Sequence, residues 1–244
     1  MKLFQYWDSG EPPAEVAGWI DGVRRLNPDL EHQLHQQTTA AAYIAGRLGA
    51  REAAAFQACA VPAMQADYFR LCALHAEGGV WIDADTEALG PISGLFQDAP
   101  RSLMLEWDGF FGTTVMMFRQ PGDAFVGAFL ELATRNIEGR RYSSAVLATG
   151  PMLADGLRAH IDPQWAAEVM APRAAEPLVK TRLGLLAGIR TEIAVTDALL
   201  EAYRAMTIPH TMKALDYVRF RDPAYKNTGR HWANWKGSIY REAP

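Results

Sequence analysis

The chain of 244 residues is predicted to fold as an α/β sandwich with a mainly parallel central sheet. Short apolar segments with the period of strands alternate with longer segments of helical period. The alternation has the spacing of βαβ units, and Gly or Pro stands at most of the predicted boundaries. Because no repeat, low-complexity tract or linker divides the chain, we expect a single domain over residues 1–244.

The first third of the chain contains the clearest predicted elements. A strand over 2–7 ends at Gly10-Glu11-Pro12-Pro13, and an amphipathic helix over 14–26 and a strand over 30–35 follow. The Ala-rich segment 40–56 is predicted to be one helix despite Gly49. Pro62 suits the first turn of another helix, which Gly78-Gly79 ends before a buried strand over 80–84.

The remaining elements have weaker patterns. Two strands are predicted over 103–106 and 113–118 around a turn at Gly109, followed by a helix over 123–136 and a late strand over 189–195.

Composition excludes several classes of protein. With 24 Lys and Arg against 28 Asp and Glu, the net charge is −4, which argues against a nucleic-acid partner. Cys59 and Cys72 can build neither a disulfide framework nor a four-ligand zinc site, so a reducing setting is expected. We expect that the polar N-terminal segment is not a secretory signal, and no apolar run of the sequence approaches the length of a membrane span. We expect a cytoplasmic protein with at most peripheral membrane association at the inner face.

An Asp-x-Asp triplet ends the buried strand over 80–84. Strand alternation places Val80 and Ile82 on one face, and Trp81, Asp83 and Asp85 on the other. The two carboxylates would be roughly 6–7 Å apart at Cα, close enough to share one hard cation. In open α/β sheets, ligands bind beyond the carboxyl ends of the strands. The alternative is a pair of acids in a solvated turn.

Asp67 and Arg70 lie three residues apart on the preceding helix, and therefore on one face of it. Because that helix leads directly into the strand, this face is expected to lie near the strand's carboxyl end. A surface ion pair is the simpler alternative for the two residues alone. The whole block, residues 66–70 followed by 78–85, is far more specific than either pair.

This block resembles the core of the DXD-motif sugar transferases of glycosyltransferase family 32, which include fungal initiating mannosyltransferases, bacterial polysaccharide transferases and the large glucosylating toxins. The similarity extends over about 200 residues in the same order. The further matching segments are Phe4-Gln5-Tyr6-Trp7, Pro12-Pro13, Trp19, Asn27-Pro28-Asp29, Thr149-Gly150-Pro151 and His231-Trp232-Ala233-Asn234-Trp235.

The resemblance implies a GT-A-like nucleotide-binding fold and a metal-dependent retaining transfer from a nucleotide diphosphate sugar. It implies that Asp85 is a direct ligand of Mn²⁺ or Mg²⁺ and that Asp83 shares the metal or holds the ribose. Asp67 and Arg70 would bind donor sugar hydroxyls. Trp7 would stack on the base or, alternatively, be a core aromatic. The catalytic residues implied are Asp83, Asp85 and Arg70.

The segment 219–244 is basic and aromatic within an acidic chain. It could be a single-strand nucleic-acid platform or a C-terminal anchor. The resemblance favours a flap over the donor diphosphate, with His231 or Asn234 as a further metal ligand and Trp235 and Lys236 as donor-binding residues.

Two kinds of alternative remain for the activity. A haloacid dehalogenase-type phosphatase also carries Asp-x-Asp, but it needs Thr or Val where this chain has Glu87. A non-catalytic nucleotide-sugar or glycan-binding protein is the other alternative. For the transferase we expect a UDP-sugar, or else a GDP-sugar, as donor and a glycan or lipid-linked glycan as acceptor, in bacterial surface polysaccharide synthesis. Glu106 and Asp108, just after a predicted strand, are the only nearby candidates for the carboxylate nucleophile of a double displacement, and the alternative is that they are turn acids.

Overall fold

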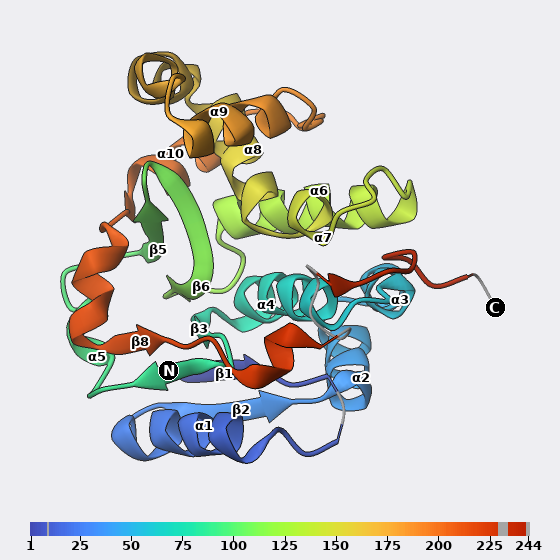
Figure 1. The fold of residues 1–244 in the computed structure, drawn as a ribbon, viewed down its shortest axis with the longest axis vertical. Coiled ribbons are helices and arrows are strands. Elements are labelled where there is room, and N and C mark those ends of the chain that lie inside the picture. The colour runs from blue at the N-terminus through green and yellow to red at the C-terminus, as the bar shows by residue number, and fades with distance from the viewer. Residues whose placement is uncertain (9, 229–233, 243–244) are drawn as a thin grey trace.

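A computed structural model describes residues 1–8, 10–228 and 234–242, and its ribbon is shown in Figure 1. Within these residues the central sheet has six strands in the order β2-β1-β3-β6-β5-β7. Only β6 runs against its neighbours in the sheet, because the β1–β2, β1–β3 and β5–β7 pairs are all parallel. The mainly parallel sheet is therefore confirmed. Its strands are β1 (Lys2–Tyr6), β2 (Glu31–His35), β3 (Gly79–Ile82), β5 (Ser102–Trp107), β6 (Phe110–Phe118) and β7 (Met206–Thr207).

The segment 40–56 forms two helices, so its prediction as one helix was wrong. The first helix ends at Arg47, and Gly49 has a φ of +117°, a conformation that favours Gly over residues with a side chain. The helical propensity of the alanines cannot overcome this break. The helices of the first third are α1 (Ala14–Leu26), α2 (Gln37–Arg47), α3 (Ala50–Ala58) and α4 (Pro62–Glu77).

The predicted strand over 189–195 is also absent from the described structure, where this segment is an irregular connection. Its carbonyl groups are satisfied by side chains: Arg135 donates to Glu192 O at 2.7 Å, and the ring of His160 contacts Ile193 O at 3.0 Å. Ile189 packs over Gly156, so its hydrophobicity reflects helix contacts. Beyond β6 lie α6 (Ala124–Glu138), α7 (Ala145–Ala148), α8 (Pro151–Ile161), the π-helix η1 (Trp165–Met170), the 3₁₀ turn η2 (Ala171–Arg173), α9 (Pro177–Leu186) and α10 (Asp197–Arg204).

A second, smaller sheet joins the middle of the chain to its C-terminal part. β4 (Thr86–Ala88) pairs with β8 (Val218–Phe220) in antiparallel register. Figure 1 shows β8 in the half of the molecule that contains the N-terminal elements, and α9 in the opposite half. The remaining short elements are α5 (Ser93–Phe96) and the 3₁₀ turns η3 (Thr211–Asp216) and η4 (Ala224–Asn227).

The two faces of the central sheet carry separate hydrophobic cores, as expected for a sheet covered on both sides. Val80 and Ile82 of β3 pack with Val23 of α1 on one face. Trp81 packs with Phe69 of α4 and Phe129 of α6 on the other. This confirms the predicted alternation along β3.

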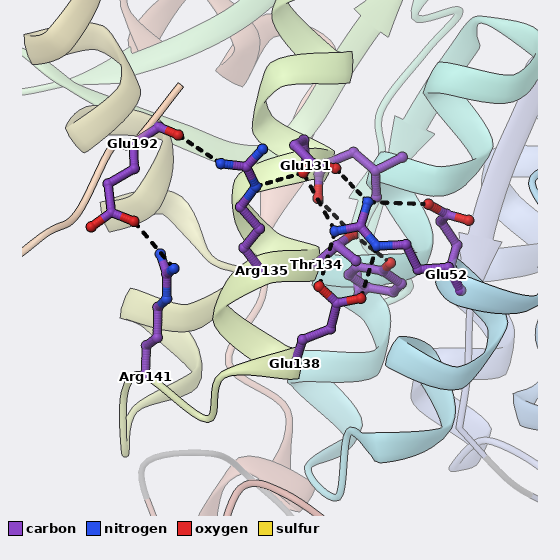
Figure 2. Close-up of polar contacts among 10 residues, drawn as sticks. Glu52, Glu131, Thr134, Arg135, Glu138, Arg141 and Glu192 are labelled. Carbon is purple, nitrogen blue, oxygen red and sulfur yellow. Dashed lines mark hydrogen bonds and ion pairs between the residues drawn. The ribbon is translucent and has the colours of Figure 1, made fainter. Parts of the chain in front are cut away.

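Helices α3 and α6 are held together at the surface by the ion-pair network in Figure 2. Arg51 of α3 contacts Glu131 at 2.7 Å and Glu138 at 2.8 Å, both on α6. Arg135 joins Glu131 to the 189–195 connection.

In the described part of the chain, every helix is too short or too polar to cross a bilayer.

Candidate active site

Helix α4 places Asp67 and Arg70 beside the carboxyl end of β3. The helix starts at Pro62 and ends at Glu77, and the φ of the next residue, Gly78, is +66°. A Cβ at Gly78 would lie 2.7 Å from Phe118 O, and one at Gly79 would lie 2.7 Å from Lys2 O. Only Gly fits such close backbone approaches. Because the connection between α4 and β3 is this short, the face of α4 that contains Arg70 lies next to the carboxyl end of β3.

Arg70 is the centre of a buried polar cluster. Its Nη2 atom lies 3.0 Å from Oδ1 of Asp67 and 2.9 Å from Oδ1 of Asp83, and its Nη1 atom donates to Thr113 O at 2.6 Å. The guanidinium also lies 5.0 Å from the ring centroid of Trp81, whose indole N–H donates to Asp83 Oδ1 at 2.7 Å. Arg70 is only 4% exposed, so the alternative prediction that Asp67 and Arg70 form a surface ion pair is wrong.

Asp85 receives its partners from the C-terminal part of the chain. Tyr225 donates its hydroxyl to Asp85 Oδ2 at 2.9 Å, and Lys226 Nζ lies 2.9 Å from the same oxygen. The β4–β8 pairing and the ion pair between Glu87 and Arg221 bring these residues to the site.

Burial and neighbouring charges shift the pKa values of the ionisable groups in this cluster. Burial raises the pKa of Asp67 to about 6, although the Arg70 guanidinium acts against the shift. Burial also raises the pKa of Asp83, opposed by Arg70 and reinforced by the charge of Asp85. The pKa of Tyr225 is raised by burial and then by Asp85. The hydroxyl of Tyr225 therefore stays protonated and can donate to the carboxylate.

These groups line one cavity of about 380 Å³, a volume within the usual range for small-molecule sites. The cavity lies beyond the carboxyl ends of β1 and β3, where α/β proteins bind ligands. Its charged and aromatic lining residues are Tyr6, Trp7, Asp8, Asp67, Arg70, Trp81, Asp83, Asp85, Phe220, Arg221, Tyr225 and Lys226.

Trp7 combines features of both of its predicted roles. It lines the cavity, but it is only 8% exposed and packs with Val16 and Ile20 of α1. Its ring meets that of Tyr225 edge to face at 5.3 Å, and its buried indole nitrogen lacks a hydrogen-bond partner among the described residues. Base stacking by Trp7 stays a prediction.

Of the two predicted tail ligands, the structure describes only Asn234, and it does not place this residue in the cavity of Asp85. His231 lies outside the described residues. Asn234 donates its amide to Lys226 O at 2.8 Å and to Thr228 O at 3.3 Å. Trp235 lines a separate cavity of about 200 Å³, and Lys236 is exposed. Because Asn234, Trp235 and Lys236 are absent from the lining of the larger cavity, their metal and donor roles stay predictions.

The tail has both an anchored end and a part that lines the site. Ala60 N–H donates to Ile239 O, Arg241 N–H donates to Ala58 O, and Tyr240 is buried, so the anchor interpretation holds for this end. Phe220 and Tyr225 line the site cavity.

Glu106 and Asp108 do not reach the cavity. Glu106 pairs with Arg158 at 2.7 Å, and Asp108, with a φ of +52°, sits in the β5–β6 turn near Arg173. Their predicted proximity to the donor is therefore wrong.

Sequence reasoning missed Tyr225 and Lys226 as partners of Asp85, and Gly150 as a neighbour of Asp67. A Cβ at Gly150 would lie 3.1 Å from Asp67 Oδ2. The Thr149-Gly150-Pro151 segment signalled its position, whereas no local pattern distinguishes Lys226 from the other basic tail residues.

The cluster fits a hard divalent cation. Asp83 and Asp85 face one cavity and supply carboxylate oxygens, and the described residues donate no hydrogen bond to Asp83 Oδ2 or Asp85 Oδ1. Within the described ranges, no three His, Cys, Asp or Glu side chains could hold a metal alone. Mg²⁺ commonly takes one or two carboxylates and completes its shell with phosphate and water, so two aspartates suffice.

The residues of this cluster lie within a segment that matches a known protein family. Residues 13–102, which contain Asp67, Arg70, Asp83 and Asp85, match the family described as glycosyltransferase sugar-binding region containing DXD motif. The chain carries a DXD-motif glycosyltransferase region. No curated protein sequence matches the chain.

Two solved structures are similar to this glycosyltransferase. One is the PaToxG glycosyltransferase, with a TM-score of 0.57 and 13% identity over 89% of this chain and 87% of that one. The other is the ligand-free glycosyltransferase domain of the YGT toxin, with a TM-score of 0.48 and 10% identity over 85% of this chain and 79% of that one. The first supports the predicted GT-A-like fold, which is confirmed.

Proposed function

We propose that this glycosyltransferase moves a sugar from a nucleotide diphosphate sugar to an acceptor hydroxyl with retention of anomeric configuration. The observation that carries the proposal is the convergence of Asp67, Arg70, Asp83 and Asp85 on one cavity at the carboxyl end of β3. UDP-sugars are the favoured donors and GDP-sugars the alternative. The acceptor is a glycan or lipid-linked glycan, in cytoplasmic synthesis of bacterial surface polysaccharide, as the family resemblance suggests.

The residues have separate roles in this proposal. Asp67 and Arg70 bind sugar hydroxyls of the donor. The ion pairs of Arg70 with Asp67 and Asp83 hold both carboxylates in position. Trp7 binds the base at the end of β1. Asp85, with Asp83, would hold Mn²⁺ or Mg²⁺, which offsets the negative charge that develops on the departing diphosphate.

Retention is supported by the acids that line the cavity. Among the described lining residues these are Asp8, Asp67, Asp83 and Asp85. Asp67 and Asp83 contact Arg70, and Asp85 contacts Lys226 and Tyr225. Asp8 directly follows Trp7, at the base-binding end in this proposal. None of the four is placed as the general base of an inverting reaction. In the proposed same-face transfer, the acceptor oxygen bonds to the anomeric carbon, the bond to the diphosphate breaks, and a diphosphate oxygen takes the acceptor proton.

The test is donor turnover with Mn²⁺ for a panel of UDP- and GDP-sugars, comparing wild type, Asp85→Asn and Asp98→Asn. Asp98 is an exposed acid outside the cavity, so its variant should match wild type. We expect Asp85→Asn to lose turnover while remaining folded. Sugar transfer or release separates the enzyme from a binding protein. Proton NMR of the product should show an α linkage from an α-linked donor. Full activity in excess EDTA would contradict the metal assignment, and a β linkage from an α-linked donor would contradict the retaining transfer.

A further inference from the structure

The contact between Lys226 and Asp85 places an ammonium group on one of the carboxylates proposed to hold the cation. Lys226 Nζ lies 2.9 Å from Asp85 Oδ2, and it also donates to Arg221 O at 3.0 Å. The side chain of Asp85 is 16% exposed and that of Lys226 is 26% exposed. The pair is therefore sheltered but open to the cavity that both residues line.

The backbone around Lys226 is held independently of this contact. Ala224 N–H donates to Glu15 Oε1 at 3.2 Å, Thr228 donates its hydroxyl to Tyr225 O at 2.6 Å, and Arg221 pairs with Glu87. The β4–β8 pairing precedes this segment. The ammonium can therefore leave Asp85 by rotation of its side chain while η4 stays in place.

Charge determines which partner the ammonium prefers. While Lys226 contacts Asp85, its positive charge opposes the arrival of a dication at the same carboxylate. A diphosphate in the cavity offers Lys226 a more highly charged acceptor, and lysine binds phosphate as a mobile point charge. Once the ammonium has moved, it no longer compensates the negative charge of Asp85.

We propose that Lys226 occupies the cation position at Asp85 in the free protein and moves to the donor diphosphate on binding, so that the metal and the donor bind cooperatively. This inference rests on the proposed function, because it requires a metal at Asp85 and a diphosphate in the cavity. By linkage, the factor by which UDP raises Mn²⁺ affinity equals the factor by which Mn²⁺ raises UDP affinity. Lys226 contributes to this factor twice, by weakening the metal site before the diphosphate arrives and by binding the diphosphate afterwards.

The experiment measures Mn²⁺ binding by electron paramagnetic resonance with and without UDP, correcting for the Mn²⁺–UDP complex in solution. It compares wild type, Lys226→Met, Lys226→Arg and Lys213→Met. Lys213 is an exposed residue of η3 outside the cavity, so it provides a matched control. Circular dichroism confirms that each variant is folded.

We expect Lys226→Met to bind Mn²⁺ alone about tenfold more tightly than wild type and to lose most of the increase that UDP causes. Lys226→Arg should retain the cooperativity of wild type, and Lys213→Met should be indistinguishable from it. If UDP raises Mn²⁺ affinity equally in wild type and Lys226→Met, and Mn²⁺ alone binds both equally, Lys226 is only a structural ion pair and the inference is wrong. If neither protein binds Mn²⁺ even with UDP, the metal assignment in the proposed function fails first.

Discussion

Arg70 donates to Oδ1 of Asp83 at 2.9 Å, joining helix α4 to the turn that follows β3. The same nitrogen lies 3.0 Å from Asp67, so one buried cation compensates two carboxylates. A buried charge left without its partner is strongly destabilising. This relationship makes Arg70 a structural requirement of the site before any substrate binds.

We therefore expect Arg70→Ala to lower the free energy of unfolding by about 3–5 kcal/mol, because Asp67 and Asp83 lose their buried cation. Arg70→Lys should be less destabilising but should weaken donor binding, since an ammonium cannot reproduce the planar contacts to Asp83 and Thr113. Urea denaturation measures the first effect, and UDP-sugar titration the second. Arg24→Lys, at an exposed pair with Asp21, is the control and should change neither quantity.

Trp7 provides a test of the base-binding end of the cavity. If its indole stacks on the base, Trp7→Leu should weaken UDP–Mn²⁺ binding by about 1–3 kcal/mol, on the scale of base stacking. The chain has seven Trp residues, so ligand-induced quenching of total fluorescence should fall without vanishing. Trp107→Leu is the matched control, because Trp107 is 47% exposed and does not line the cavity. Equal affinity in wild type and Trp7→Leu would make Trp7 a core residue only.

Gly150 has no room for a side chain. Its φ of −91° is open to any residue, but an added Cβ would lie 2.9 Å from Val146 Cα and 3.1 Å from Asp67 Oδ2. Gly150→Ala should destabilise the protein by about 1–3 kcal/mol and weaken donor binding through displacement of Asp67. Gly184→Ala, in α9 with nothing within 4 Å of the added Cβ, should instead stabilise it by about 0.5–1 kcal/mol. Thermal unfolding distinguishes them, and equal effects would refute the steric argument.

Asp155 of α8 should make stability depend on pH. Its Oδ1 accepts the N–H of Phe111 at 2.7 Å, and burial raises its pKa from 3.8 to about 8, against the opposing effects of that bond, Arg182 and Arg158. Between these values the folded state keeps a proton that the unfolded chain has released. This group therefore lowers stability as pH rises through that interval.

In Asp155→Asn the side chain cannot ionise, so this contribution should disappear. The slope of unfolding free energy against pH should become more positive by up to about 1.4 kcal/mol per unit, the limit for one proton. Urea denaturation at several values between pH 5 and pH 8, chosen inside the interval between the two pKa values of Asp155, measures the slope. Unchanged slopes would show that Asp155 is ionised in the fold.

Local sequence patterns determined the helix α4 and part of the candidate site. The period of the apolar residues in α4, Pro62 at its start and the two glycines at its end depend only on neighbouring residues, and the structure confirms all three. The same local rules grouped Asp67 with Arg70 and placed Asp83 on the face of Trp81, as their hydrogen bonds show. Such features can be predicted from the sequence because the helix and strand periods are properties of the backbone.

Only the tertiary structure determined which segments that are distant in the sequence contact one another. The φ of +117° at Gly49 divides a segment whose alanines favour one helix, and side chains of α6 and α8 satisfy a connection that resembled a strand. Lys226 reaches Asp85 because β4 pairs with β8 across more than a hundred residues of sequence. Only the packed fold determines which of several basic tail residues meets the carboxylate, because that choice depends on strand pairing and not on local period.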